Sequence, residues 1–377
     1  MRVLHTSDWQ LGMTRHFLAA EDQGRFSQAR VDAIRRLGDL AAAEDCACMV
    51  VAGDVFETSH PDPRTVMRTL DALRDVTVPV YLLPGNHDPL EAGSVWRSSA
   101  FRDRCPGHVE VLDGTRPRRP VEGFEVLGAP WTSKQPLTDL TAEACEQAPD
   151  DGACRVVVGH GSVAEVSGGF DAAGTIDLGR VQRAVDEGRV RYVALGDRHS
   201  CTRVDPDGHV WYAGAPEPTD YDEVDAGTAL VVDLAGPRPA VTRHHLGTWH
   251  FHRLHHEVTG DDDLEALAAD LAAIEDPERA IVKVSVTGTL DLRQVARLDE
   301  VLDERALALA ALEHPDRHRD LAVRVSDDDV ADLPLSGYAA TARDRLLATA
   351  AAGGADGEVA TDALGLLLRL ARTEDGR

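Results

Sequence analysis

The feature that most constrains this chain is a short apolar segment that recurs along its first half and ends beside a polar residue suited to metal binding. Continuous apolar segments of this kind are typical of strands that are buried on both faces of a sheet. They cover residues 3–6, 49–52, 78–83, 155–158 and 192–195. The polar residues that follow them include Asp8, Asp54, Asn86, His160 and His199. The chain is therefore predicted to carry candidate ligands at the ends of several buried strands.

Helical patterns lie between the early strands. Apolar residues recur at helical spacing over 26–41 and again over 66–73. Alternating strands and helices imply parallel strands with right-handed crossovers, whose carboxyl ends all lie at one edge of the sheet. We therefore expect the candidate ligands to converge on one rim. From about residue 124 the pattern becomes more purely β, and a second sheet is predicted from segments 124–127, 209–212, 228–234 and 241–246.

The pattern changes again near Gly247. Strand, helix, strand and helix are predicted in that order over 251–258, 264–274, 280–286 and 292–302, which indicates a compact second α/β unit. An acidic stretch at 327–332 and a linker at 334–337 precede two amphipathic helices at 339–351 and 359–370. The predicted domains are therefore 1–247, 248–335 and 336–377.

The charge balance restricts the class of partner. With 39 Lys and Arg against 65 Asp and Glu, the net charge is −26, which argues against a generally basic nucleic-acid-binding protein. Local basic clusters occur at 97–104 and 116–119, where we interpret each single residue as solvated. No apolar run approaches the roughly 20 residues that span a bilayer. No leader-like pattern precedes the first strand, so we expect a cytoplasmic protein that binds no membrane.

The candidate ligands suit one kind of chemistry. Phosphodiester hydrolysis requires an activated water, neutralisation of the phosphate and help for the leaving oxygen. Two cations roughly 3.5–4 Å apart supply the first two together. Carboxylates, neutral imidazoles and amide oxygens hold such cations, and a shared carboxylate lies between them. Two Asp, one Asn and two His provide that set of ligands.

The sequence blocks around these residues resemble the signature of the calcineurin-like metallophosphoesterases. Asp8 stands in the first block, and the others are 53–57 (GDVFE), 85–88 (GNHD), 159–161 (GHG) and 196–199 (GDRH). Segments 5–12 (HTSDWQLG), 53–58 (GDVFET), 194–196 (ALG) and 212–214 (YAG) are further similar to the SbcD-type DNA repair exonucleases of that family. Segment 284–288 (VSVTG) is similar to a strand of their DNA-capping domain. The resemblance covers the first predicted domain well and the second more loosely.

The resemblance implies a fold and a biological setting. The fold is α/β, a two-sheet β-sandwich flanked by helices, with a smaller α/β capping domain and a C-terminal helical tail. The implied activity is metal-dependent DNA exonuclease and endonuclease activity in repair. The implied partners are DNA, a second copy of the chain in a homodimer, and an SbcC-like, SMC-family ATPase. The tail would dock on the coiled coil of that ATPase, and packing of the tail onto the second domain is an equal alternative.

The resemblance also implies ligand roles. Asp8, Asp54 and His199 would hold one metal ion, and Asp54 would bridge to the other. The remaining ligands of the second ion would be Asn86, His160 and Asp197. Each role is carried over from the matching position of the family motif.

Two motif residues would act on the leaving group rather than on a metal. His87 would lie beside the phosphate and protonate or stabilise the leaving oxygen. Asp88 would orient the ring of His87. A satisfied loop histidine is the alternative interpretation of His87.

Two positions depart from the family pattern, which has His where this chain has Gln10 and Asp197. Gln10 still offers a carbonyl oxygen, and Asp197 offers a carboxylate. Both changes replace nitrogen by oxygen, which favours harder ions, Mn²⁺ first and Mg²⁺ second, over zinc. The alternative is a decayed site that folds and no longer cleaves.

Three alternatives remain open from the sequence. The same fold would suit a phosphodiesterase for small or cyclic nucleotides, which the acidic net charge favours. A catalytically inactive, DNA-binding scaffold protein is the non-enzymatic alternative. The histidines between 244 and 256 invite a second metal site, but their alternation favours one solvated face of a strand.

Overall fold

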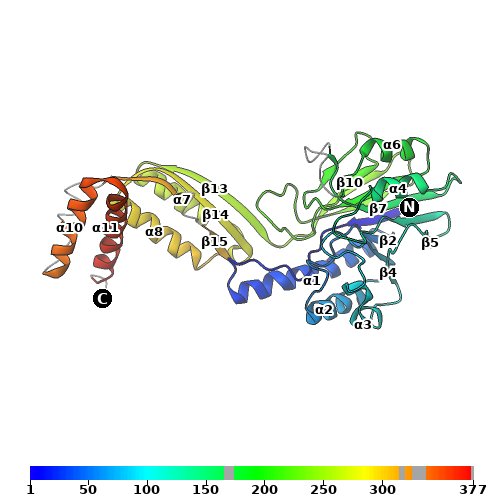
Figure 1. The fold of residues 1–377 in the computed structure, drawn as a ribbon, viewed down its shortest axis with the longest axis horizontal. Helices are drawn as coiled ribbons and strands as arrows, with labels where there is room; N and C mark the ends of the chain where they lie inside the picture. Colours follow the sequence, from blue (N-terminus) through cyan, green and yellow to red (C-terminus); the bar gives the residue numbers. More distant parts are fainter. Residues whose placement is uncertain (165–173, 314–318, 325–336, 375–377) are drawn as a thin grey trace. The chain divides into compact units, whose positions relative to one another are not determined.

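The computed structural model describes residues 1–164, 174–313, 319–324 and 337–374 (Figure 1). Its contacts divide into two compact units. The first contains Met1–His16 and Ala20–His250, and the second contains Phe17–Ala19 and Phe251–Arg377. Among the described residues, no helix is both long and apolar enough to cross a membrane.

The first unit contains two six-stranded sheets. One sheet has the order β12 (Ala240–His245), β11 (Thr228–Asp233), β1 (Arg2–Thr6), β2 (Cys46–Val51), β3 (Val80–Leu82) and β4 (Val109–Val111). Strands β1 to β4 are parallel, and β11 pairs antiparallel with β1. The other has the order β5 (Arg118–Val121), β6 (Phe124–Gly128), β7 (Cys154–His160), β8 (Tyr192–Gly196), β10 (Val210–Tyr212) and β9 (Thr202–Arg203). In it β6, β7, β8 and β10 are parallel.

The two sheets pack face to face, because alternate residues of each strand point to opposite sides. Val3 belongs to the core between the sheets, with Val50 of β2 and Val156 and Ala194 of the other sheet. Its neighbour Leu4 lies on the other face, in the core beneath the helices. The result is the predicted two-sheet sandwich, and the fold class is confirmed.

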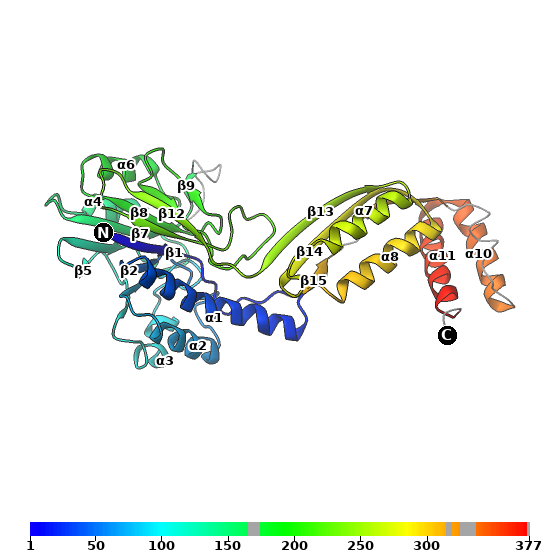
Figure 2. The ribbon, with the colours of Figure 1, turned by 180° about the vertical axis from the view of Figure 1, so that it is seen from behind.

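Helices cover both outer faces of the sandwich (Figures 1 and 2). On the β1 side these are α1 (Ala20–Ala43), α2 (Pro63–Arg74), the 3-10 turn η1 (Val95–Arg97) and α3 (Ser99–Arg102). On the β7 side they are α4 (Leu140–Gln147) and α6 (Leu178–Asp186). Asp62 caps α2 through Arg64 N, and Pro63 opens that helix, where a missing N–H has no consequence.

A buried histidine joins the two sheets beneath their carboxyl ends. His5 of β1 lies 3.0 Å from the Tyr192 hydroxyl through Nδ1 and 3.2 Å from the Leu195 carbonyl oxygen through Nε2. The neutral ring with its proton on Nε2 donates to the carbonyl and accepts from the hydroxyl. Burial lowers the pKa of His5 to about 3, although the hydrogen bond from the ring to the Leu195 carbonyl acts to raise it. His5 is therefore a neutral link between the sheets.

Two expectations about the sheets were wrong. The segments predicted at 228–234 and 241–246 form β11 and β12 of the first sheet, not strands of the second. The strands that carry the candidate ligands also do not share one sheet, since β1 to β3 belong to one and β7 and β8 to the other. The carboxyl ends meet because two sheets stack, not because one sheet has a single edge.

The second unit has one sheet and four helices among its described residues. Its strands are β13 (His250–Val258), β14 (Ala280–Asp291), β15 (Ala311–Glu313) and β16 (Arg319–Arg324), and both β15 and β16 pair with β14. Its helices are α7 (Asp261–Ala272), α8 (Leu292–Ala306), α10 (Tyr338–Ala352) and α11 (Gly354–Glu374), with a 3-10 turn η2 (Pro277–Arg279). Apolar residues of α7 and α8 pack on the sheet, and Leu364 of α11 packs on Leu292 and Ala296 of α8. The predicted linker at 334–337 falls almost entirely outside the described residues.

Candidate metal centre

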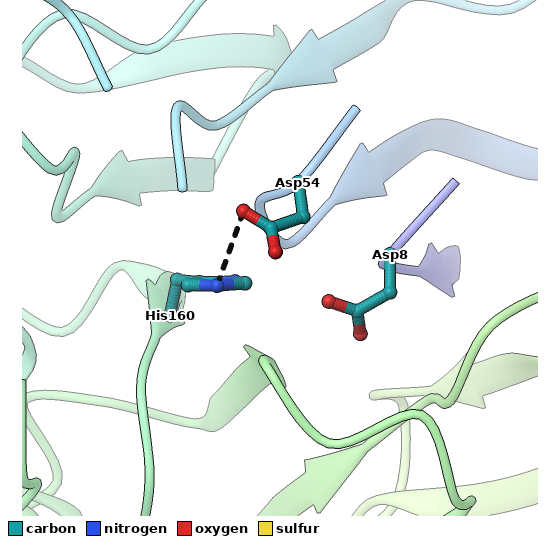
Figure 3. Close-up of side chains that lie close together, drawn as sticks. All are labelled: Asp8, Asp54 and His160. Atoms are coloured by element: carbon teal, nitrogen blue, oxygen red, sulfur yellow. Dashed lines mark ion pairs between the residues drawn. The ribbon is translucent and has the colours of Figure 1, made fainter. Parts of the chain in front are cut away.

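The candidate ligands lie at the carboxyl ends of five strands of the first unit. Asp8 follows β1, Asp54 follows β2, Asn86 follows β3, and His160 is the last residue of β7. Asp197 and His199 follow β8. Figure 3 shows the carboxylates of Asp8 and Asp54 and the imidazole of His160 directed toward a common space. These three residues offer ligand atoms that all lie within 4.8 Å of one another.

One half of the centre surrounds the Nε2 atom of His160. That nitrogen lies 2.7 Å from Asn86 Oδ1, 3.4 Å from Asp54 Oδ1 and 3.8 Å from Asp197 Oδ1. Asn86 in this orientation turns its oxygen toward other acceptors, and a rotated amide would instead donate to both Asp54 oxygens at 3.3 and 3.2 Å. The side-chain oxygens of Asn86, Asp54 and Asp197 around this nitrogen are ligand types that divalent cations bind.

The other half surrounds the second oxygen of Asp54. Asp54 Oδ2 accepts a hydrogen bond from Gln10 Nε2 at 3.1 Å, and the same nitrogen lies 3.4 Å from His199 Nε2. Asp8 accepts from the Asp197 backbone N–H at 3.0 and 3.3 Å through its two oxygens. Asp54 therefore faces both halves, one oxygen toward each, as expected of a bridging ligand.

The backbone at the centre is strained. Asp8, Gln10, Asp54 and Asp197 have positive φ angles of 51°, 49°, 52° and 97°. Non-glycine residues rarely adopt this conformation, and they keep it where the surrounding structure enforces it, often at functional sites.

Motif glycines make room for the ligands. A Cβ on Gly53 would lie 2.1 Å from His160 Nδ1, and one on Gly85 would lie 2.2 Å from Asp54 Oδ1. A Cβ on Gly196 would lie 1.9 Å from the Ala52 carbonyl oxygen. Real Cβ atoms do not approach other atoms so closely, so these positions require glycine.

Each ligand histidine is oriented through its second nitrogen. His160 Nδ1 lies 2.8 Å from the Ala52 carbonyl oxygen, to which it donates, so Nε2 is the nitrogen that faces the centre. His199 Nδ1 lies 2.6 Å from Thr219 Oγ1 and 3.2 Å from Glu223 Oε1. Such outer partners fix the tautomer of a ligand histidine and raise its basicity.

Thr219 and Glu223 lie in an irregular loop after β10, outside the motif blocks, so the sequence alone does not reveal their role. Glu223 is tied to that loop through Oε2, which accepts from the Thr219 backbone N–H at 2.9 Å. Only a general expectation pointed to this loop. A histidine that binds metal through one ring nitrogen usually donates a hydrogen bond from the other, and the acidic residues of this loop are possible acceptors.

His87 lies at the margin of the centre, with 41% of its side chain exposed and Nε2 3.9 Å from Asp54 Oδ2. Its Nδ1 donates to the Glu57 carbonyl oxygen at 3.0 Å, so the carbonyl and not Asp88 orients the ring. Asp88 is fully buried and accepts from Gly85 N at 2.7 Å and Phe56 N at 2.9 Å. The expected contact is therefore corrected: Asp88 braces the loops that carry Asp54 and Asn86.

The side chains of the centre concentrate negative charge. Burial raises the pKa of Asp8 to about 6, although His199 and His160 act to lower it. Burial alone would lower the pKa of His160, but Asp54, Asp197 and Asp8 together raise it to about 9. Carboxylates, an amide and imidazoles in this arrangement fit divalent cations, whose charge would take the place of the protons.

One protein family and several known relatives match the sequence of this chain. The sequence profile of the family described as calcineurin-like phosphoesterase matches residues 1–201. The D subunit of the nuclease SbcCD from Rhodobacter capsulatus is 29% identical over 281 residues, which cover 63% of this chain and 67% of the relative. Its Escherichia coli K12 counterpart is 28% identical over 255 residues, 59% of this chain and 62% of the relative. The DNA double-strand break repair protein Mre11 of Saccharolobus solfataricus is 23% identical over 231 residues, 60% of this chain and 57% of the relative.

Solved structures give weaker matches. TT1561 of Thermus thermophilus is 12% identical with a TM-score of 0.40, over 64% of this chain and 97% of that one. A dimetal phosphatase from Danio rerio is 11% identical with a TM-score of 0.41, over 64% and 95% of the two chains.

Proposed function

Because the chain belongs to the calcineurin-like phosphoesterase family, we propose that it is a two-metal phosphodiesterase that cleaves DNA during repair. The observation that carries the proposal is the convergence of six ligand-type side chains from two stacked sheets around Asp54. The relatives support the substrate, since they are named as parts of the nuclease SbcCD and as a double-strand break repair protein. The proposed activity is that of an exonuclease and endonuclease.

The proposed ligands fall into two sets that share Asp54. Asp8, Gln10 and His199 complete one set, and Asn86, His160 and Asp197 complete the other. Two bound cations would lower the pKa of a water molecule and neutralise the charge of the phosphate. The oxygen-rich ligand set supports Mn²⁺, with Mg²⁺ as the second candidate.

His87 is proposed to serve the leaving oxygen. Its Nδ1–H is held by the Glu57 carbonyl, so protonation and deprotonation occur at Nε2, which lies on the Asp54 side of the ring. Its exposure lets a phosphodiester approach that nitrogen. An imidazolium there would donate a proton to the departing oxygen, and general acid catalysis of this kind contributes roughly 10²–10⁴-fold.

The proposed setting is a complex. The names of the SbcCD relatives describe one component of an assembly, and we propose a homodimer bound to an SMC-like ATPase. The C-terminal helices support a docking role, since Val359 and Leu366 of α11 are 68% and 48% exposed while Leu364 packs on α8. Helix α11 would then pack on α8 with one face and dock on the ATPase partner with the other.

A small-nucleotide phosphodiesterase is the second candidate, and the net charge of −26 favours it because DNA is a polyanion. The second unit favours DNA, since a small substrate needs no additional α/β unit. The test compares duplex DNA, cyclic nucleotides and bis-p-nitrophenyl phosphate as substrates of the full chain with Mn²⁺, alone and with the ATPase partner.

The expected result is cleavage of DNA and of the nitrophenyl diester, with loss of both in Asp54→Asn and His87→Ala. His245→Ala, an exposed histidine of β12, is the matched control and should retain activity. Preference for cyclic nucleotides would favour the second candidate. Unchanged cleavage in Asp54→Asn would reject the proposed centre, and absence of cleavage despite bound Mn²⁺ would favour an inactive scaffold.

A further inference from the structure

Arg30 of α1 carries a buried positive charge beside the segments that bear one set of proposed ligands. It is 2% exposed, and it donates to three backbone carbonyl oxygens, those of Pro218 at 2.8 Å, Glu217 at 3.3 Å and Trp9 at 3.4 Å. Burial lowers the pKa of Arg30 to about 10, although Glu217 and Glu223 act to raise it, so the guanidinium is charged at neutral pH. A guanidinium carries its N–H groups in a rigid planar fork, which lets one side chain hold several acceptors at once.

The three carbonyl groups belong to two segments that place ligands. One lies in the middle of segment 8–10, whose first and last residues are proposed ligands. The other two are followed at once by Thr219, whose hydroxyl oxygen lies 2.6 Å from His199 Nδ1. Glu223 Oε1, in the same loop, lies 3.2 Å from that nitrogen. Arg30 therefore connects segment 8–10 to the loop that orients His199.

The beginning of that loop is fixed separately through the Glu217 side chain. Its carboxylate is fully buried and accepts hydrogen bonds from N and Oγ1 of Thr248, at 2.9 Å each. Arg36 of α1 also donates to this carboxylate. The backbone at Glu217 is therefore firmly held, and Arg30 joins segment 8–10 to it.

We propose that Arg30 is a positioning residue of the metal centre: its guanidinium fixes segment 8–10 and the loop that orients His199 relative to each other. The inference rests on the proposed two-metal function and concerns which residue outside the ligand set holds one metal position together. Arg30 acts through backbone carbonyl groups and is neither a ligand nor a catalytic residue. Metal–ligand distances tolerate only about 0.2 Å, so a small relative shift of the two segments would weaken the binding of a cation that both contact.

The expected loss follows from the size of such supporting effects. Residues that support ligands without touching the metal change its affinity by roughly 10- to 100-fold. Arg30→Met removes every donor of the side chain, so one of the two Mn²⁺ dissociation constants should rise by roughly that factor. Arg30→Lys keeps the positive charge but replaces the fork by a compact ammonium, so its effect should be smaller than that of Arg30→Met. The other dissociation constant should change less, because Asn86, His160 and Asp197 lie on other segments.

The experiment titrates Mn²⁺ into the metal-stripped full chain and measures both dissociation constants by calorimetry. Arg155→Met is the matched control, because Arg155 is also a buried arginine, 1% exposed, whose Nε donates to Glu125 at 2.7 Å. Arg155 lies at the amino end of β7, whereas the ligand His160 lies at its carboxyl end. Thermal unfolding without metal measures the stability of each variant, which both Met substitutions should lower. Only the substitution of Arg30 should change Mn²⁺ binding. Arg30→Lys and Arg155→Lys are the milder pair and carry the comparison if a Met variant does not fold.

A second comparison tests which metal position Arg30 supports. His199→Ala disables the position that Arg30 is proposed to hold, so that one Mn²⁺ affinity remains to be measured. Adding Arg30→Lys to His199→Ala should change this remaining affinity less than Arg30→Lys alone changes the weakened one.

The inference predicts weaker Mn²⁺ binding in the Arg30 variants and native binding in the Arg155 variants, at comparable losses of stability. Native Mn²⁺ binding in folded Arg30 variants, or an equal loss of binding in the Arg155 variants, would overturn the inference and leave the proposed function intact. An equally large effect of Arg30→Lys in the His199→Ala background would overturn it as well. Absence of any tight Mn²⁺ site in the native chain would reject the proposed function itself.

Discussion

A single methyl group at Gly85 should disable the metal centre while leaving the fold intact. In Gly85→Ala the new Cβ would lie 2.2 Å from Asp54 Oδ1 and 2.5 Å from the Asp54 backbone nitrogen. The closest approach that real Cβ atoms show is 3.0 Å, so the Asp54 oxygen must withdraw by 3.0 − 2.2, or about 0.8 Å. Metal–ligand distances tolerate only about 0.2 Å. Because Asp54 faces both metal positions, Mn²⁺ affinity should fall at least 100-fold, or about 2.7 kcal/mol.

The loss of fold stability should be about 1–3 kcal/mol, as for an overpacked buried position. Calorimetric titration with Mn²⁺ measures the first quantity, and thermal unfolding without metal measures the second. Gly24→Ala in α1 is the control, because a Cβ at this position meets no atom within 4 Å. This substitution should increase the stability of the helix by up to about 1 kcal/mol and leave Mn²⁺ binding unchanged. Native Mn²⁺ affinity in Gly85→Ala would refute the placement of Asp54 at the centre.

Three further outcomes are expected. Glu223→Gln should weaken the binding of one Mn²⁺ by roughly 10- to 100-fold, because the carboxylate beside His199 Nδ1 is lost. Calorimetry measures this affinity, and an unchanged isotherm would show that Glu223 does not support the centre. Mn²⁺ at about 100 times its dissociation constant should raise the free energy of unfolding by about 2.7 kcal/mol. A chelator should abolish this increase, and Asp54→Asn should not show it. Burial holds the pKa of His5 at about 3 in the folded chain, against about 6.5 in the unfolded chain. Between these two pH values the unfolded chain binds a proton that the folded chain does not bind. The free energy of unfolding should therefore fall as the pH drops from 6.5 to 3, by at most about 1.4 kcal/mol per pH unit. Chemical unfolding of the metal-free chain should show a shallower acid slope in His5→Gln, and equal slopes would contradict the neutral His5.

The strand ends and their polar residues were predictable because both signals are local. An apolar run that stops at Asp8 or Asp54 identifies a buried strand and the residue at its end. The ordered motif blocks then identified the calcineurin-like family, which the profile match confirms. Motif glycines such as Gly85 were equally visible, although only coordinates show which atom each one accommodates.

The partners of each strand were not predictable, since pairing is a property of distant segments. Strand β11 resembles an ordinary buried strand, and only its antiparallel register with β1 assigns it to the first sheet. The same limitation hid the stacking of β7 and β8 against β1 and β2, which brings the two halves of the centre together. Sheet membership therefore had to come from the structure.

Supporting groups around the ligands were also hidden. Glu223 and the Glu57 carbonyl act through contacts with His199 and His87, and neither contact leaves a periodic trace in the sequence. The expected role of Asp88 failed for the same reason: adjacency in sequence to His87 suggested contact, whereas the carboxylate turns inward to Gly85 and Phe56.

Diffraction from crystals of the full chain soaked in saturating Mn²⁺, recorded near the manganese absorption edge, tests the central claim most directly. We expect two anomalous peaks roughly 3.5–4 Å apart on either side of the Asp54 carboxylate. One peak should contact His160 and Asn86, and the other should contact His199 and Asp8. Peaks elsewhere, or no peak within coordination distance of Asp54, would contradict the account.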